Sequence, residues 1–389
     1  RIRGSTISDQ QDIQIRVVNS IDRVNARQWN ALLQGSPPFL SHAFLAALEH
    51  NDCVGETFGW LTRFYLAERN GELVGAVPLY VKDNSYGELV FDWAWADAYH
   101  RHGLSYYPKM VVALPYTPAT GPRLLLADAS DKATADALID ATLSDARELG
   151  MSSLHWLFTT EQDNEFLKAK GLFSRKGFQF HWHNRGYGSF DDFLAELSSK
   201  KRKNIRRERR LVRDAGVQLE WRLGGEMNDA LWDELYRFYR ATFDRKSGVA
   251  TLSLGFFKEI GRSLPEQVIV VLARRDVRYI AGAVMFRSAD TLYGRHWGCT
   301  EFIDGLHFET CYYQGLDYCI REGLQRFEPG AQGEFKISRG FLPTETWSAH
   351  WLAHPEFHDA INRHVDHERE MVDDYMGDLG EHSPYRCNE

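Results

Sequence analysis

The sequence predicts an α/β (α+β) protein that contains two tandem copies of one module, with mixed, mostly antiparallel sheets flanked by helices. The first observation is an internal repeat, since three short matches share a single offset of 207 residues. The matches are Gly75-Ala76-Val77 with Gly282-Ala283-Val284, Asp83 with Asp290, and Tyr86-Gly87 with Tyr293-Gly294. The second observation is that strand and helix patterns recur in one order on both sides of a basic segment, which predicts a basic linking helix between the copies.

The first copy begins with apolar residues at Ile13, Ile15 and Val17, an alternation that is typical of a strand. Ser41 is expected to cap the second of two short helices. Asn70-Gly71 joins two strand patterns in a predicted hairpin. Helix-ending glycines then separate helices from strands. The predicted strands are 13–17, 64–68, 73–81, 88–93, 153–158 and 177–183, and the predicted helices are 21–33, 41–50, 133–149 and 161–170.

The same order of patterns restarts after residue 216. Pro355 is expected to open a C-terminal helix, because proline suits the first helical turn. The predicted strands are 218–222, 268–273, 279–286, 291–297, 326–328 and 334–339, and the predicted helices are 229–243, 254–260, 308–321 and 355–375. We therefore expect an N-terminal module over 13–188, a basic linking helix over 189–216 and a C-terminal module over 217–380.

The linking segment carries most of the positive charge. Residues 200–213 (KKRKNIRRERRLVR) have a net charge of +8, which leaves −16 on the rest of a chain whose total is −8. Such a stripe favours an anionic ligand, although a solvated helix face without a ligand is the alternative. Arg202, Arg206 and Arg209 would lie on one side of the helix, a spacing that suits a row of phosphates.

Composition sets the class of protein. The chain has 389 residues, 43% hydrophobic and 13% aromatic, which excludes a mainly disordered chain. Residues 1–12 lack the apolar core of a secretory signal, and no apolar stretch is long enough to span a membrane. Five scattered cysteines favour free thiols in a reducing compartment, so we expect a cytoplasmic protein. The cysteines are Cys53, Cys299, Cys311, Cys319 and Cys387.

Four segments carry a resemblance to a known family. They are 117–123 (TPATGPR), 201–206 (KRKNIR), 307–315 (HFETCYYQG) and 330–341 (GAQGEFKISRGF). With the order of elements, they resemble the FemAB-like peptidoglycan biosynthesis/recognition proteins, predicted N-acyltransferases, over about residues 39–355. The resemblance implies two tandem GNAT-like acyltransferase modules, with the basic helix at a substrate cleft between them, and acyl or aminoacyl transfer to an amine.

The acyl donor is not identified by a motif. GNAT enzymes that use acetyl-CoA bind its pyrophosphate with a Gln/Arg-x-x-Gly-x-Gly/Ala turn at a helix N-terminus. The nearest segments, which begin at Arg185 and Arg295, do not complete that turn. We therefore expect no required cofactor and leave the donor open among aminoacyl-tRNA, an acyl carrier and acyl-CoA.

Residues 330–341 are the leading candidate for the reaction site. On a strand, Glu334, Lys336 and Ser338 would share one face. Lys336 is expected to contact a phosphate or stabilise the oxyanion, and Arg339 to hold a carboxylate or phosphate with two hydrogen bonds. The alternative is a structural turn with an exposed Glu334–Lys336 pair.

The helix after the second hairpin supplies further candidates. Glu309 and Tyr313 are four residues apart and Tyr312 is three from Glu309, so they lie on one side of a helix. Glu309 is a candidate acceptor of the amine proton, and Tyr312 or Tyr313 could donate to the leaving group. His296 and Trp297 end the preceding strand, where open sheets bind ligands. The alternative is that these rings are half-buried core.

The first copy offers binding residues rather than catalytic ones. We interpret 99–121, rich in aromatic residues and proline, as a long functional loop. Thr117 and Arg123 are candidates for binding an extended acceptor, and a purely structural first copy is the alternative. No metal site is predicted, because the spaced histidines 350, 354 and 358 are interrupted by Pro355 and form no known ligand pattern.

These observations support two classes of function. The first is an N-acyltransferase that acts on an amine of a peptidoglycan precursor or another anionic small-molecule or peptide substrate. In this class tRNA is a candidate partner and DNA is not. The second is a non-catalytic protein that recognises peptidoglycan precursor or RNA. A CoA-dependent acetyltransferase of the GNAT superfamily is a further alternative.

Overall fold

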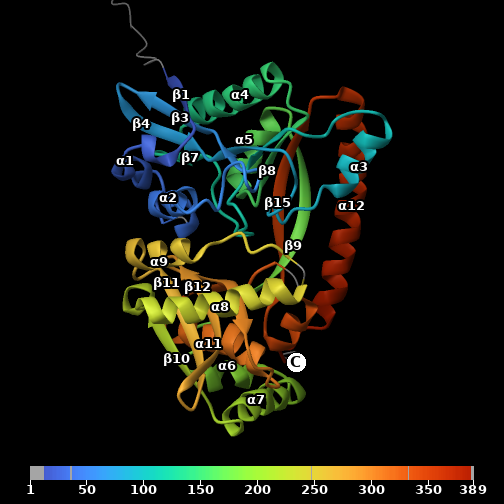
Figure 1. The fold of residues 1–389 in the computed structure, drawn as a ribbon. Coiled ribbons are helices and arrows are strands. Elements are labelled where there is room, and N and C mark those ends of the chain that lie inside the picture. Colours follow the sequence, from blue (N-terminus) through green and yellow to red (C-terminus); the bar gives the residue numbers. More distant parts are fainter. Residues whose placement is uncertain (1–12, 36, 247, 332, 387–389) are drawn as a thin grey trace, which may run out of the picture.

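The computed structural model of the chain describes residues 13–35, 37–246, 248–331 and 333–386 (Figure 1). The segment 1–12 that bears on a signal sequence, Gln332 of the 330–341 segment and Cys387 lie outside the described residues. Across these ranges, no helix has the length and apolar character needed to cross a membrane.

Two sheets form the framework of the described chain. The smaller has the order β1-β3-β4-β7 and the larger β10-β11-β12-β13-β14-β9-β15-β8-β6-β5-β2. The small sheet consists of β1 (Gln14–Val18), β3 (Phe64–Arg69), β4 (Glu72–Val77) and β7 (Leu125–Leu126). The large sheet consists of β2 (Leu61–Thr62), β5 (Leu79–Lys82), β6 (Lys109–Val112), β8 (Ser153–Leu157), β9 (Phe173–His183), β10 (Val217–Leu223), β11 (Val268–Arg275), β12 (Arg278–Arg287), β13 (Thr291–Cys299), β14 (Arg326–Glu328) and β15 (Leu342–Leu352).

Helices flank both sheets, and the long C-terminal helix α12 runs beside β9 and β15 (Figure 1). The α-helices are α1 (Ala26–Ala31), α2 (His42–His50), α3 (Trp93–Arg101), α4 (Lys132–Glu148), α5 (Glu161–Ala169), α6 (Phe190–Glu196), α7 (Ser199–Asp214), α8 (Asp229–Lys246), α9 (Leu254–Ser263), α10 (Leu306–Phe308), α11 (Gln314–Glu322) and α12 (Pro355–Glu381). The 3₁₀ turns are η1 (Ile21–Arg23), η2 (Pro38–Leu40), η3 (Gly224–Glu226) and η5 (Glu334–Arg339), and the π turn is η4 (Glu309–Tyr313). Ser41 caps α2 as predicted, accepting a hydrogen bond from the backbone N–H of Phe44.

The repeat is visible in the strand pairing. Register shifts fall after Ala67 in the β3–β4 pair and after Ala273 in the β11–β12 pair. The matched glycines have matching roles, because an added Cβ at Gly75 would meet side chains of α4 and one at Gly282 would meet side chains of α8. Both glycines therefore allow a helix to lie close against the hairpin.

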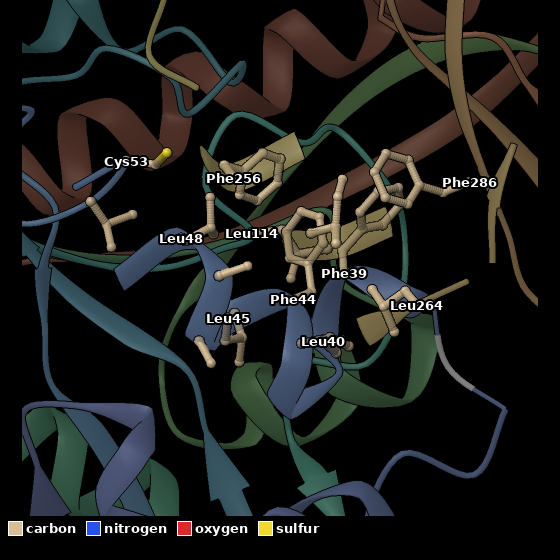
Figure 2. Packing of buried hydrophobic residues seen from close by; sticks show 14 of the residues in the cluster. Phe39, Leu40, Phe44, Leu45, Leu48, Cys53, Leu114, Phe256, Leu264 and Phe286 are labelled. Carbon is tan, nitrogen blue, oxygen red and sulfur yellow. The ribbon is translucent and has the colours of Figure 1, made fainter. Parts of the chain in front are cut away.

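The two halves are interlocked rather than merely linked. Strand β15, from the C-terminal half, lies between β8 and β9 of the N-terminal half and is antiparallel to both. Apolar packing joins the halves elsewhere, around the residues of Figure 2. There the rings of Phe39 and Phe286 lie 5.0 Å apart and those of Phe44 and Phe256 lie 5.5 Å apart. Sites at the junction are therefore built on a shared core.

Two predictions in the first half are wrong. Residues 88–93 do not form a strand, and 99–121 is not one long loop, since it holds the end of α3 and all of β6. Charged residues are the reason, because Lys109 of β6 is buried and its Nζ donates to Glu88 and Asp92. A buried ion cluster breaks the apolar pattern on which strand prediction depends. Pro78 also divides the predicted strand 73–81 into β4 and β5.

Two predictions in the second half are also wrong. Residues 334–339 form the 3₁₀ turn η5 instead of a strand, so Glu334, Lys336 and Ser338 do not share a strand face. Gly333 and Gly340 bracket this turn with φ values of 125° and 96°, which bend the chain away from an extended path. The basic linking helix is two helices, α6 and α7, because buried Leu197 between them has an extended backbone.

Candidate functional site

The candidate site begins where two parallel strands separate. β13 and β14 pair only over Thr291–Tyr293 and Arg326–Glu328. The β12–β13 register then shifts, with Met285 opposite Gly294 and Val284 opposite His296. Arg295 is therefore the extra residue of a β-bulge, a feature that redirects a side chain. Its guanidinium donates to the carbonyl oxygen of Tyr116 in the N-terminal half.

A cavity of about 260 Å³ lies beside the separated strands, and we call it the strand-separation pocket. Three predicted residues, His296, Trp297 and Tyr312, line it together with Arg295, Cys311 and Pro329. Burial lowers the pKa of His296 well below its usual value, so this imidazole is neutral at pH 7. The pocket is therefore lined mainly by rings and by one redirected arginine.

Lys336 lies in η5, close to this pocket. Its side chain is buried, and its Nζ donates to the carbonyl oxygen of Gly330 at 2.9 Å. Within the described ranges no carboxylate lies at ion-pair distance from Nζ, and the Cys311 thiol of the pocket wall is an electrostatic neighbour of Lys336. Burial lowers the pKa of Lys336 to about 8. A lysine with this pKa carries its charge at neutral pH and gives up a proton readily.

Glu309 is engaged by the basic helix. The guanidinium of Arg209 on α7 donates to both Glu309 oxygens at 3.1 Å and to Asp317 at 2.8 Å. Gln314 donates a further hydrogen bond to Glu309 at 2.7 Å. Burial raises the pKa of the Glu309 carboxyl, and the Arg209 charge opposes that rise. Glu309 and Arg209 therefore hold α7 against η4.

Tyr313 of η4 and Arg339 of η5 form a second cluster around Glu208 on α7. Arg339 donates to Glu208 at 2.8 Å, to the Tyr313 hydroxyl at 3.1 Å and to the backbone oxygen of Phe335 at 2.7 Å. The Tyr313 hydroxyl donates in turn to Glu208, and burial raises the pKa of Tyr313. The structure thus brings the predicted residues Glu309, Tyr313 and Arg339 together, with partners that fix their side chains.

The other predicted arginines of α7 face outward. Arg206 pairs with Asp191 at 3.1 Å, and both side chains are exposed. Arg202 donates a hydrogen bond to Ser199 at 3.4 Å and has no ion pair within the described part of the chain, so the expected row of three arginines toward one ligand is not formed. Four other basic residues are exposed and have no ion pair in the part of the chain that is described. They are Lys200, Lys203, Arg207 and Arg210.

A larger cleft of about 930 Å³ lies between the two halves, and we call it the long cleft. Its walls come from the 89–91 loop, β9, residues 331 and 333–335, β15 and α12. The predicted residue Glu334 lies here and accepts a hydrogen bond from the Tyr375 hydroxyl. Apolar side chains dominate its walls, including Val90, Phe158, Phe178, Trp347 and Val372.

Thr117 and Arg123 are buried near the junction of the halves. The Thr117 hydroxyl donates to the carbonyl oxygen of Pro115 at 3.0 Å. Arg123 donates to the carbonyl oxygens of Leu157 and Ala119 at 2.9 and 2.8 Å, and burial lowers its pKa to about 10. These contacts indicate a structural role, and a substrate-binding role for either residue stays a prediction.

Sequence reasoning missed two polar groups at the strand separation, Arg295 and Glu328. Glu328 ends β14, is buried, and forms an ion pair with Arg326, whose Nε lies 3.1 Å from Glu328 Oε1. Burial raises its pKa to about 7. The signal for Glu328 was a charged residue directly before Pro329-Gly330 at the end of a short apolar strand. In the residues that the structure covers, no group of three His, Cys, Asp or Glu side chains could hold a metal ion.

The architecture defines a class of protein, a tandem GNAT-like fold whose halves each contain a bulged antiparallel hairpin. A family model described as peptidoglycan biosynthesis/recognition matches residues 20–387. The chain therefore belongs to the FemAB-like family, and the predicted resemblance and fold class are confirmed. No curated protein matches the sequence significantly.

Solved structures with the same fold span nearly the whole chain. FemX has 13% identity and a TM-score of 0.56, covering 89% of this chain and 100% of that chain. The C-terminal domain of a putative lysylphosphatidylglycerol synthetase from Agrobacterium fabrum has 10% identity and a TM-score of 0.54, covering 86% and 94%. L-PGS from Bacillus licheniformis has 12% identity and a TM-score of 0.53, covering 88% and 97%. At these identities the similarity shows the fold alone.

Proposed function

We propose that this protein transfers an acyl or aminoacyl group to an amine of a peptidoglycan precursor, at the strand-separation pocket. The observation that carries the proposal is Lys336, a buried lysine without a carboxylate partner among the described residues, beside that pocket. Membership of a peptidoglycan biosynthesis/recognition family supports the choice of acceptor. FemX and L-PGS from Bacillus licheniformis share this fold.

The residues divide into two roles in this proposal. The Lys336 ammonium stabilises the oxyanion that develops as the amine attacks the donor carbonyl. Glu328 directly precedes the pocket residue Pro329 and is paired with Arg326. We assign it the role of accepting the amine proton, which its pKa of about 7 suits at neutral pH. Glu309, Tyr313 and Arg339 keep α7, η4 and η5 in place around the pocket. Donor and acceptor are thus held together in a shielded site.

The test measures turnover with a nucleotide-linked muropeptide as acceptor and, in parallel, an aminoacyl-tRNA, an acyl carrier thioester and an acyl-CoA as donors. Mass spectrometry detects the new amide. We expect Lys336→Met to lower turnover by about 100-fold or more while muropeptide affinity stays within a few-fold. Lys132→Ala, an exposed lysine on α4, is the matched control and should behave as the wild type.

Two results would contradict the proposal. If no donor gives product although the wild type binds the muropeptide, the protein is a recognition protein. If Lys336→Met turns over as the wild type does, the reaction centre lies elsewhere.

One observation favours a second function, recognition of RNA by α7. Lys200, Lys203, Arg207 and Arg210 follow i, i+3, i+7 and i+10 and form one exposed stripe without ion pairs among the described residues. The apolar residues Ile205 and Val212 of this helix are buried in the protein, so they cannot insert into a lipid surface. Binding of tRNA that weakens steeply with salt, and weakens further in Lys203→Glu, would support it.

A further inference from the structure

A chain of hydrogen bonds leads from the long cleft into the centre of the large sheet. It starts at Ser348 on β15, whose Oγ lies 2.7 Å from His350 Nε2. His350 Nδ1 lies 2.7 Å from His155 Nδ1 on β8. His155 Nε2 lies 3.1 Å from the Tyr106 hydroxyl, which donates to Asp92 Oδ2 at 2.7 Å. All five residues are buried, and Ser348 lines the long cleft.

The carboxylate at the inner end fixes the direction of the Tyr106 hydrogen bond, and the proton position on His155 sets the directions of the others. Lys109 donates to Asp92 and holds the pKa of that carboxyl below its usual value despite burial, so Asp92 can only accept. Tyr106 donates its one proton to Asp92. His155 Nε2 lies 3.1 Å from the Tyr106 oxygen and 2.7 Å from Ser153 Oγ, and we assign the His155 proton to Nε2, with these two oxygens as acceptors. His155 Nδ1 is left as an acceptor, so the proton between the imidazoles belongs to His350 Nδ1. His350 Nε2 is consequently free to accept the Ser348 proton.

This assignment gives Ser348 the partners of an activated nucleophile. Its hydroxyl donates to an imidazole, and that imidazole is oriented by a second group on its other nitrogen. Burial lowers the pKa of His155 and His350 well below their usual value, so both rings are neutral, as the assignment requires. The Trp95 ring packs edge-on against His350, with ring centroids 4.9 Å apart, and holds its orientation.

The surroundings of Ser348 suit a carbonyl substrate with an apolar group. Arg175 lies directly opposite Ser348 in the β9–β15 ladder and lines the same cleft. Its guanidinium is held by both oxygens of Glu368 at 2.7 Å and by the carbonyl oxygen of Phe91 at 2.7 Å. An ion-paired guanidinium is therefore held in the cleft that Ser348 lines. The cleft walls beyond it are largely apolar side chains.

We propose that Ser348, with His350 as its base, is a second reactive site that accepts an acyl group from an oxygen ester or thioester with an apolar acyl chain. Ser348 Oγ forms a bond to the carbonyl carbon, and the bond from that carbon to the leaving oxygen or sulfur breaks. The Ser348 proton moves to His350 Nε2 and from there to the leaving alcohol or thiol. The product is an acyl ester of Ser348. This site is separate from Lys336 and does not depend on the transfer proposed above.

The test uses an alkyl phosphonofluoridate, which labels activated serines by forming an Oγ–P bond with loss of fluoride. The intact protein is measured by mass spectrometry and the labelled peptide is then mapped. We expect one adduct, on Ser348, that is absent from Ser348→Ala. We expect His350→Gln to slow labelling by about 100-fold or more, because the general base is lost.

Ser174→Ala is the matched control. Ser174 is a buried serine on the neighbouring strand β9, and its hydroxyl has no hydrogen-bond partner in the described chain. Its loss should leave the labelling rate unchanged. Thermal unfolding reports whether each variant is folded. If His350→Gln does not fold, Tyr106→Phe replaces it, since it removes only the link to Asp92 and should slow labelling by about 10-fold.

Three results would overturn the proposal. They are a folded wild type that takes up no label, an adduct mapped to another residue, and labelling of Ser348 at the wild-type rate when His350 or the Tyr106 hydroxyl is absent. None of them bears on turnover at Lys336, so failure of this inference and failure of the proposed transfer are distinguishable.

Discussion

Removing the charge of Arg209 is expected to destabilise the protein strongly, because it leaves a buried carboxylate without its cation. In Arg209→Met the apolar stem is kept, but two hydrogen bonds of 3.1 Å to Glu309 and one of 2.8 Å to Asp317 are lost. Breaking a buried pair from one side costs about 3–5 kcal/mol. Arg209 keeps 27% of its side chain exposed while Glu309 keeps 5%. We therefore expect a loss of about 2–3 kcal/mol in the free energy of unfolding at pH 7.

The loss should depend on pH with a definite sign. Burial raises the pKa of Glu309 in the folded state above its value in the unfolded state. Between these two pKa values the folded protein binds a proton that the unfolded chain has lost, so the free energy of unfolding falls as pH rises through that range. The Arg209 charge limits this rise in the Glu309 pKa in the wild type, and its removal widens the pH range between the two pKa values. The difference between variant and wild type should hence be larger at pH 7 than at pH 5, because a more acidic solution protonates a larger fraction of Glu309.

Urea unfolding at the two pH values measures both quantities. Arg206→Met is the control, because Arg206 pairs with Asp191 in solvent, where side-chain exposures are 58% and 80%. Such a pair contributes at most about 1 kcal/mol. Equal losses in the two variants, or a loss in Arg209→Met that does not change with pH, would refute the view that the Glu309 cluster is a buried anchor for α7.

Two further changes probe the framework and the site. Gly298→Ala should cost more than about 3 kcal/mol, since its Cβ would lie 1.8 Å from the Phe238 carbonyl oxygen. Gly377→Ala on α12 meets open space and should add about 0.5–1 kcal/mol, so equal effects in urea unfolding would contradict the close contact of β13 with α8. In the wild type, the free energy of unfolding should rise by about 1–3 kcal/mol between pH 8 and 10.5, because the unfolded chain still binds the proton that folded Lys336 has lost. Lys336→Met should remove this rise. A wild type and variant with parallel pH curves would show that Lys336 is not a buried cation.

Local patterns predicted the elements whose causes are local. Ser41 caps α2, Asn70-Gly71 turns the first hairpin, and Gly150 in the left-handed conformation follows the end of α4. The repeat predicted the tandem fold, because the same bulged hairpin needs the same small residues under a helix, as at Gly75 and Gly282. These features depend on a few neighbouring residues and can be found in one sequence.

The features of the fold and of the candidate site that were not predicted depend on contacts between segments distant in the sequence. Lys109 looks like a loop residue until its partners Glu88 and Asp92 are known. Arg209 looks like one of many cations on α7 until η4 places Glu309 against it. The division into 13–188, 189–216 and 217–380 stays a prediction, since the large sheet is built from strands on both sides of the linking segment.

The position of β15 accounts for the location of both proposed sites. By lying between β8 and β9, this strand brings Ser348 and His350 of the C-terminal half to His155 of the N-terminal half. The η5 turn that carries Lys336 directly precedes β15 and follows the end of β14, so the same chain crossing also sets the strand-separation pocket. In a duplicated fold whose halves were joined only by a linker, neither of these groups of side chains would be brought together. The position of β15 is therefore the structural reason that both proposed sites, one beside Lys336 and one at Ser348, lie where the two halves meet.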